Sequence, residues 1–261
     1  MEKSKTKVIT ARLIVLVIIL AGWEFIPKLF KGSGIVILDP LFISSPSATA
    51  KDLWTIWSNG LVLSAIWSTL SASLLGLAIG VVLGYAVAVI FGEFKGVASI
   101  FIVYFDAINA IPRIALFPLI VILAGFGTIS KVIGAVIVVF FIVFYNAFQG
   151  ARSVSQETLD AYNIQGAGRW FKVRYIKAYV SFGWAVAQFP SAVAFSLVAV
   201  ITTEILISNS GLGYLLVTAT NLLDSSRVFS IIIVTAVVGV ILSAGTRFLV
   251  RQVFPWSTHI A

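Results

Sequence analysis

The residues best suited to chemistry in this sequence are the few polar and charged side chains inside its long apolar segments. Asp106, Asn109 and Arg113 share one such segment, and Glu204 lies near the end of another. A charged side chain inside a bilayer is costly, so an intramembrane ionisable residue is a functional candidate by default. These four residues are therefore the candidates for a translocation path.

Several alternatives stay open for these candidates. Asp106 and Arg113 are seven residues apart, about two helical turns, so we expect them on one helix face. There they could pair through Asn109, line a path for a polar solute, lock two helices together, or lie nearer the membrane interface than the expected span bounds. Glu204 could shape the outer end of a path or cap a neighbouring helix.

Catalysis by this chain has little support in its sequence. An enzyme needs a nucleophile, a base or a metal cluster that converge on one point. The sequence has one histidine, His259, near its C-terminal end, and no cysteine. No H-E-x-x-H or G-x-S-x-G motif occurs, and the glycine pair Gly211 and Gly213 is not followed by the Lys-Ser of a phosphate-binding loop. We predict no catalytic residue, no metal site and no cofactor bound by this chain.

The longest polar stretch, residues 152–177, is here called the polar segment. Ser153 and Gln156 have the spacing of a capping box, which predicts a short helix with Glu157 in its first turn. Leu159 and Tyr162 then share a face, and Gly166 with Gly168 ends the helix. The cations that follow are Arg169, Lys172, Arg174 and Lys177, with Trp170 and Phe171 among them. The pattern indicates a short helix that docks on a partner.

Composition identifies the elements that must position these residues. The chain has 261 residues, of which 60% are hydrophobic and 11% charged, with a mean hydropathy of +1.07. Soluble domains carry about 25% charged residues, so this is an integral membrane protein. The net charge of +8 could indicate nucleic acid, but basic residues at helix ends also orient membrane proteins. We expect no nucleic-acid partner.

Apolar runs of about 20 residues predict six membrane-spanning helices, because that length crosses the hydrocarbon core. The expected spans are residues 8–26, 66–91, 97–124, 132–148, 179–207 and 228–250. Prolines interrupt the third span and bend the fifth near Pro190. Glycines at 76, 80 and 84 predict close helix packing. Residues 47–58 and 208–226 predict short helices outside the hydrocarbon core.

The distribution of basic residues predicts the orientation. Six spans place both termini on one side, and that side carries twelve Lys and Arg residues: 3, 5, 7, 12, 95, 152, 169, 172, 174, 177, 247 and 251. The other side carries five: 28, 31, 51, 131 and 227. The basic excess predicts cytoplasmic N- and C-termini and a cytoplasmic polar segment. We expect one membrane domain, with an N-terminal helix and external segment in residues 1–60 and a core in residues 61–252, and we expect the first apolar run to be retained.

Several motifs resemble the permease subunits of bacterial ATP-binding-cassette (ABC) importers that work with a binding protein. Asp160-Ala161-Tyr162, three residues, Gly166, nine residues and Ile176 follow the spacing of that family's Glu-Ala-Ala loop. The further motifs are Ser45-Pro46-Ser47, residues 112–119, residues 125–131 and residues 203–214, which are similar to the branch that imports sulfonates, taurine and nitrate. The resemblance covers about residues 45–251.

The sequence departs from the family pattern at three places. Asp160 stands for the usual Glu, Tyr162 for the second Ala, and Ala178-Tyr179 for a Leu-Pro pair. A carboxylate is kept at position 160 with shorter reach, whereas Tyr162 adds bulk where a helix enters a partner's groove. The departures concern the fit to a partner rather than the presence of the segment.

The resemblance implies an all-α type I ABC importer permease fold in the bacterial cytoplasmic membrane. It implies two copies of a separate ATPase, which uses ATP and Mg, a second permease copy in a homodimer or a close relative, and an external solute-binding protein. The residues implied in coupling to the ATPase are Glu157, Leu159, Asp160, Ala161, Tyr162, Gly166 and Arg169. The binding protein would meet residues 27–58 and 208–226.

An ion-gradient-driven transporter that uses Asp106 is the alternative function. Such transporters are built from internal repeats with broken helices, and the two halves of this sequence show no convincing repeat. The sequence does not identify the solute. A lone Arg113 within a span would suit an anion.

Overall fold

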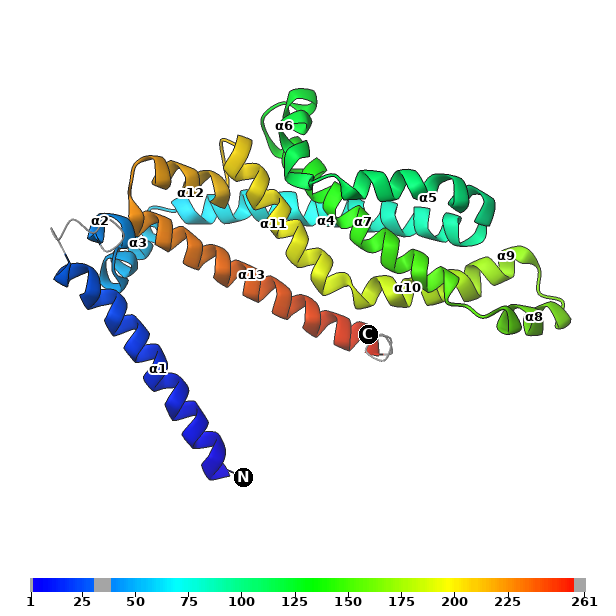
Figure 1. The fold of residues 1–261 in the computed structure, drawn as a ribbon, viewed down its shortest axis with the longest axis horizontal. Helices are drawn as coiled ribbons and strands as arrows, with labels where there is room; N and C mark the ends of the chain where they lie inside the picture. The colour runs from blue at the N-terminus through cyan, green and yellow to red at the C-terminus, as the bar shows by residue number, and fades with distance from the viewer. Residues whose placement is uncertain (1, 31–38, 256–261) are drawn as a thin grey trace. The chain divides into compact units, whose positions relative to one another are not determined.

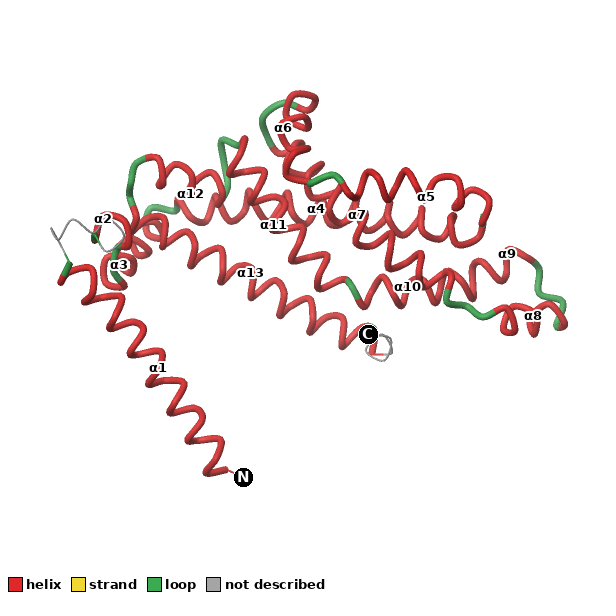
Figure 2. The backbone as a smooth tube through the Cα atoms, viewed as in Figure 1, coloured by secondary structure: helices red, strands yellow, loops and turns green. Residues whose placement is uncertain are grey.

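The computed structural model describes residues 2–30 and 39–255, and within them every regular element is a helix (Figures 1 and 2). The all-α prediction is confirmed. Lys31 and His259, both named above, lie outside the described residues. The described residues divide into two compact units: 2–30, 39–64 and 215–236 form the first, and 65–214 with 237–255 form the second.

The first unit contains α1 (Glu2–Leu29), α2 (Pro40–Ile43), α3 (Pro46–Ser58) and the beginning of α13 (Ser225–Val253). Pro46 follows the N-cap Ser45, whose hydroxyl accepts a hydrogen bond from the Ala48 amide, so α3 begins as a capped helix with proline in its first turn. Arg227 donates to Asp52 at 2.8 Å and ties α13 to α3. Trp54 and Trp57 on α3 stay exposed.

The second unit is built around α7 (Thr128–Arg152), which packs against α6 (Arg113–Ala124), α10 (Ala178–Ala187) and α11 (Phe189–Ile207). The glycine stripe of α4 (Leu61–Glu93) also lies against α7. A Cβ added to the glycine at position 80 would lie 2.8 Å from that of Val139, and one at position 84 would lie 2.7 Å from the Phe140 carbonyl. The predicted close packing at these glycines is confirmed.

The third predicted span is broken into two helices. α5 (Lys95–Ala110) and α6 are bent by 94° at the residues between them. Ile111 is extended, as residues before proline prefer, and Pro112 cannot continue the hydrogen-bond ladder of α5. The prediction that Asp106 and Arg113 share one helix face is therefore wrong, because they lie on different helices.

The other predicted spans agree with the described helices. Among the residues that the structure describes, five helices are long and apolar enough to cross a membrane, and α5 with α6 makes a sixth span if the two count as one. The fifth span is interrupted at Gln188, between α10 and α11, two residues before the proline expected to bend it. A short helix, α12 (Leu212–Asn221), occupies the predicted segment before the sixth span.

Candidate functional site

The polar segment forms a short helix, α8 (Gln156–Ile164), as predicted, but Ser153 does not cap it. Helix α7 continues to Arg152, so the Ser153 hydroxyl donates to the Gly150 carbonyl at the end of that helix. The cap of α8 is Ser155, whose Oγ accepts from the Thr158 amide at 3.2 Å. Glu157 lies in the first turn, as expected.

The end of α8 follows from Gly166, whose φ of +77° is a left-handed conformation that glycine adopts without strain. The Gly166 amide donates to the Asn163 carbonyl at 2.9 Å, and the Ala167 amide donates to the Tyr162 carbonyl at 3.0 Å. This pair of bonds is a Schellman motif, which satisfies the last carbonyls of the helix. The predicted stop at Gly166 is confirmed.

Helix α8 presents a mixed surface with no fully buried residue. Leu159 and Tyr162 are half-buried, and the Tyr162 ring lies 6.3 Å from that of Phe171. Asp160 accepts hydrogen bonds from Gln156 at 2.9 Å and from Asn163 at 3.2 Å, so its carboxylate is held along the helix. Ala161 is exposed beside them.

A short helix and a π-helical turn connect α8 to the membrane core: α9 (Arg169–Lys172) and Val173–Lys177. Figure 1 shows α8 and α9 running beside each other beyond the end of α10. Val173 and Ile176 are buried, whereas Arg169 lies over the Phe94 ring at 4.8 Å. Ile176, the last residue of the motif that resembles the Glu-Ala-Ala loop, is thus a packing residue.

Glu93 ties this connection to the end of α4, and sequence reasoning missed it. Its two carboxylate oxygens accept from Arg169 Nε at 2.5 Å and from Lys177 Nζ at 2.7 Å. One signal in the sequence could have found it. Glu93 is the acidic residue at the short turn between α4 and α5, and that turn is predicted to lie on the same side of the membrane as the cations of the polar segment. The three residues fix where the polar segment leaves the core.

The path candidates do not form one cluster. Asp106 is exposed on α5 and accepts from the Tyr145 hydroxyl at 2.6 Å. Arg113, at the start of α6, donates to Asn109 at 2.7 Å, and its Nε is buried with no hydrogen-bond partner among the described residues. The contacts therefore link Asn109 to Arg113 alone, and Asp106 is bound to α7 instead.

Glu204 is buried within a polar cluster, where its contacts favour the helix-capping alternative. Its Oε2 accepts from the Gly213 amide at 3.0 Å, in the first turn of α12. Its carboxylate also accepts from the Thr69 hydroxyl of α4 at 2.9 Å. A carboxylate at a helix N-terminus satisfies free amides and interacts favourably with the helix dipole.

Lys131 is the partner that sequence reasoning missed. It was counted among the external loop charges, yet it lies in the first turn of α7 and is 1% exposed. Its ammonium donates to Glu204 at 2.9 Å, to the Ser210 carbonyl at 2.7 Å and to the Ser68 hydroxyl at 3.0 Å. All three of its hydrogen-bond donors are thus used, as a buried lysine requires. Four segments of the second unit meet at this cluster.

A cavity of about 760 Å³ opens between α4, α10 and the end of α13, and it includes none of the four path candidates. Its lining side chains are hydrocarbon apart from the hydroxyl of Tyr85, which donates to the Ala178 carbonyl at 2.8 Å. A charged or polar solute would lose hydration there without gaining partners. This cavity suits apolar contacts rather than a solute path.

Comparison with known proteins identifies the family. A protein-family model described as 'binding-protein-dependent transport system inner membrane component' matches residues 80–255, more than half of the chain. The riboflavin transport system permease protein RibX of Chloroflexus aurantiacus is 28% identical over 218 residues, 83% of this chain and 81% of the relative. The taurine transport system permease protein TauC of Escherichia coli is 26% identical over 242 residues, 86% of this chain and 83% of the relative.

A third relative is the putative aliphatic sulfonates transport permease protein SsuC of Bacillus subtilis, 26% identical over 247 residues, 92% of this chain and 84% of the relative. The family match and the apolar helices agree on a multi-pass membrane protein with the type I permease fold. The chain belongs to the family of inner membrane components of binding-protein-dependent transport systems, the ABC transport permeases.

Proposed function

We propose that this chain is the membrane permease subunit of an ATP-driven importer and that α8 inserts into a cleft of a separate ATPase. The observation that carries the proposal is α8 itself: a capped nine-residue helix with Leu159 and Tyr162 at helical spacing and no buried residue. Helices that dock in grooves use such spaced apolar residues as their main contacts. Membership of the family supports the same role.

The working complex would contain two permease copies, two ATPase copies and an external binding protein. ATP binding, with Mg in the ATPase, would draw the two α8 helices together. Glu93 would transmit this movement, because its bonds to Arg169 and Lys177 join the polar segment to α4. Rigid-body rocking of the spans between inward- and outward-facing states is the expected motion. In this scheme the chain hydrolyses nothing, and both of its termini are cytoplasmic.

The transported solute would be small, and Arg113 makes an anion the preferred class. A buried guanidinium nitrogen without a partner is costly unless a ligand or water pairs with it. Two of the relatives are named for taurine and for aliphatic sulfonates, both of which carry a sulfonate group, although another is named for riboflavin. Arg113→Gln should lower uptake, and retention of uptake with unchanged apparent affinity would assign the residue a structural role.

Substitutions in the polar segment test the coupling role. Gly166→Pro should leave membrane insertion intact but abolish ATPase assembly or transport, because φ at this position is +77° and proline requires about −65°. Gly168→Pro is the matched control, since its φ of −66° already suits proline and its added Cβ meets no atom within 4 Å. Co-purification of the ATPase and solute uptake are the measurements. Normal uptake in Gly166→Pro would count against the coupling role.

A second pair of variants tests the carboxylate of Asp160. Asp160→Lys reverses the charge on the docking face and should prevent assembly with the ATPase. Asp160→Glu restores the residue usual in the family and should assemble normally. If Asp160→Lys also assembles and transports at the wild-type rate, this carboxylate has no part in docking.

The alternative, a secondary transporter that uses Asp106, has a direct test. Asp106 is exposed and accepts a hydrogen bond from the Tyr145 hydroxyl at 2.6 Å. In vesicles, uptake driven by a proton gradient with no ATPase present would favour this alternative. Uptake that needs both ATP and the external binding protein would exclude it.

A further inference from the structure

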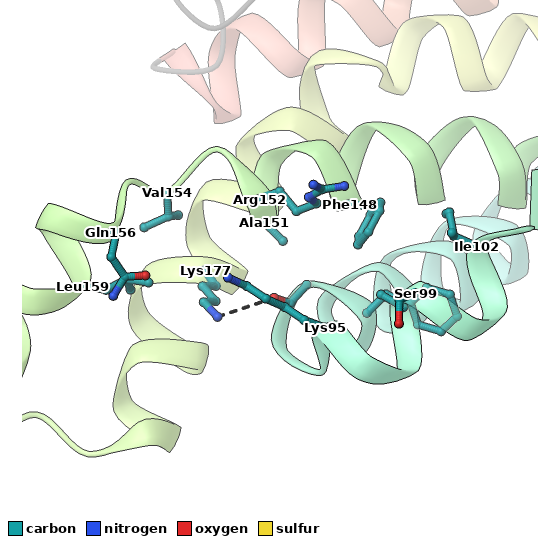
Figure 3. Close-up of a pocket in the computed structure, with 13 residues that line it drawn as sticks. Lys95, Ser99, Ile102, Phe148, Ala151, Arg152, Val154, Gln156, Leu159 and Lys177 are labelled. Atoms are coloured by element: carbon teal, nitrogen blue, oxygen red, sulfur yellow. Dashed lines mark hydrogen bonds between the residues drawn. The ribbon is translucent and has the colours of Figure 1, made fainter.

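The described cavity beside α8 differs in character from the apolar cavity between α4 and α10. It has a volume of about 370 Å³ and lies between the α4–α5 turn, the end of α7 and the start of α8 (Figure 3). Three basic side chains line it, Lys95, Arg152 and Lys177, and its lining contains no acidic residue. The remaining lining is partly polar, with Ser99 and Gln156, and partly apolar.

Two of the three cations have no carboxylate partner among the residues that the structure describes. Lys177 is paired with Glu93, just outside the cavity lining, at 2.7 Å. Neither Lys95 nor Arg152 makes an ion pair within the described chain, and the Arg152 guanidinium lies over the Phe148 ring at 5.5 Å. Two unneutralised positive charges in one concave site attract an anion.

Apolar side chains line the cavity on both sides of the basic residues, and those on the side away from α8 belong to long apolar helices. In Figure 3, Lys95 and Lys177 lie in the middle of the cavity, Gln156 and Leu159 lie on one side, and Phe148 and Ile102 lie on the other. Phe148 belongs to α7 and Ile102 to α5, so this side continues onto helices of the apolar membrane core. The site thus presents cations at the ends of spans and apolar surface along them.

We propose that this cavity binds an anionic phospholipid, with the phosphate beside Lys95 and Arg152 and an acyl chain along Phe148 and Ile102. Basic pockets between helices at the edge of a membrane protein bind anionic headgroups, and each nearby cation strengthens that attraction. The cavity also includes Gln156 and Leu159 of α8. A bound lipid would therefore contact both the core and the first turns of α8, and would hold the two together.

Lipid binding at this cavity is independent of the proposed ATPase coupling, so the lipid measurements need only the purified chain. The full-length chain is purified in detergent and titrated with phosphatidylglycerol or with phosphatidylcholine of the same acyl chains, and native mass spectrometry measures bound lipid. The first variant is the double substitution Lys95→Gln with Arg152→Gln. The matched control is Arg247→Gln with Arg251→Gln, which removes two exposed charges from α13 and leaves the cavity intact.

The wild-type chain should bind phosphatidylglycerol more tightly than phosphatidylcholine. The cavity variant should lose about tenfold in phosphatidylglycerol affinity, and the control should stay within about twofold. Equal binding by the two variants, or no preference between the two lipids, would overturn the proposal.

The same purified chain and variants distinguish a lipid from two other occupants of the cavity, a simple anion and a partner protein. If inorganic phosphate or glycerol phosphate displaces the lipid at equal concentration, the acyl chain adds nothing and the site is a simple anion site, which contradicts the proposal. If the cavity variant keeps its lipid but fails to bind the ATPase, acidic groups of a partner protein occupy the site and the lipid assignment is wrong.

Discussion

At the scale of single residues, Lys131 and Glu204 form a buried ion pair whose loss should strongly lower the stability of the chain. Their side chains are 1% and 0% exposed, so neither charge has access to water. Removing one partner of a buried pair leaves an uncompensated charge and costs about 3–5 kcal/mol. Lys131→Met should therefore unfold at a clearly lower temperature than the wild-type chain in detergent, as measured by thermal unfolding of the purified protein.

A double-mutant cycle distinguishes the ion pair from simple packing. Glu204→Gln keeps an acceptor for the Gly213 amide but removes the charge. In the Lys131→Met background it should recover part of the lost stability, since no buried charge then remains. Additive losses in the double variant would show that the two residues do not act as a pair.

Gly211 explains how the loop before α12 approaches this cluster. Its φ is +103°, and a Cβ at this position would overlap the Glu204 carboxylate. Gly211→Ala should lower the thermal stability of the chain by displacing that carboxylate. Gly96→Ala is the matched control, because an added Cβ there meets no atom within 4 Å and alanine favours the helix. Similar losses in both variants would contradict this account.

At the scale of elements, local sequence signals predicted where helices exist better than where they begin. The stop at Gly166 depends on backbone freedom at one residue, so it could be predicted from sequence. The start of α8 could not, because Ser153 and Ser155 are both acceptable caps. The choice between them depends on how far α7 continues, which its packing against α10 and α11 decides.

The break between α5 and α6 is a second boundary that local sequence does not decide. Prolines at 112 and 118 both indicated an interruption, yet only Pro112 ends a helix, and Pro118 lies inside α6. Propensity alone does not distinguish them, because neighbouring helices can compensate a proline within a membrane segment. The bend separated Asp106 from Arg113 and removed their predicted common face.

The attachment of the polar segment to α4 gives a prediction for this element. Arg169 is 61% exposed, so its bond to Glu93 contributes little, whereas Lys177 is 14% exposed and should matter more. Lys177→Gln should therefore increase hydrogen exchange across residues 169–177 by more than Arg169→Gln does. Exchange measured by mass spectrometry in the purified chain is the readout, and the reverse order would show that Glu93 acts chiefly through Arg169.

For the whole molecule, composition and apolar length were sufficient for the fold class, but not for the contacts that give the candidate sites their geometry. Lys131 and Glu204 are 73 residues apart, and Glu93 and Lys177 are 84 apart. No local pattern links such pairs. A single sequence shows a lysine at the start of an apolar run as an ordinary flanking charge, and only the packing of α7 reveals that it is buried.

The orientation of the whole chain can be tested directly, because the sequence has no cysteine to interfere with labelling. Ile164 at the end of α8 is 89% exposed and Leu222 after α12 is 74% exposed, so either can be replaced by cysteine without disturbing a core. One predicted crossing, residues 179–207, separates them. The excess of basic residues around the polar segment places Ile164 in the cytoplasm and Leu222 outside.

An impermeant thiol reagent added to intact cells with a permeable outer envelope should therefore label Leu222→Cys at once. Ile164→Cys should react only after the inner membrane is opened. Labelling of both positions from outside would mean that residues 179–207 do not cross the bilayer. Labelling of Ile164→Cys alone would invert the chain and remove the polar segment from the side where an ATPase can reach ATP, so this one measurement bears on the orientation and on the proposed coupling together.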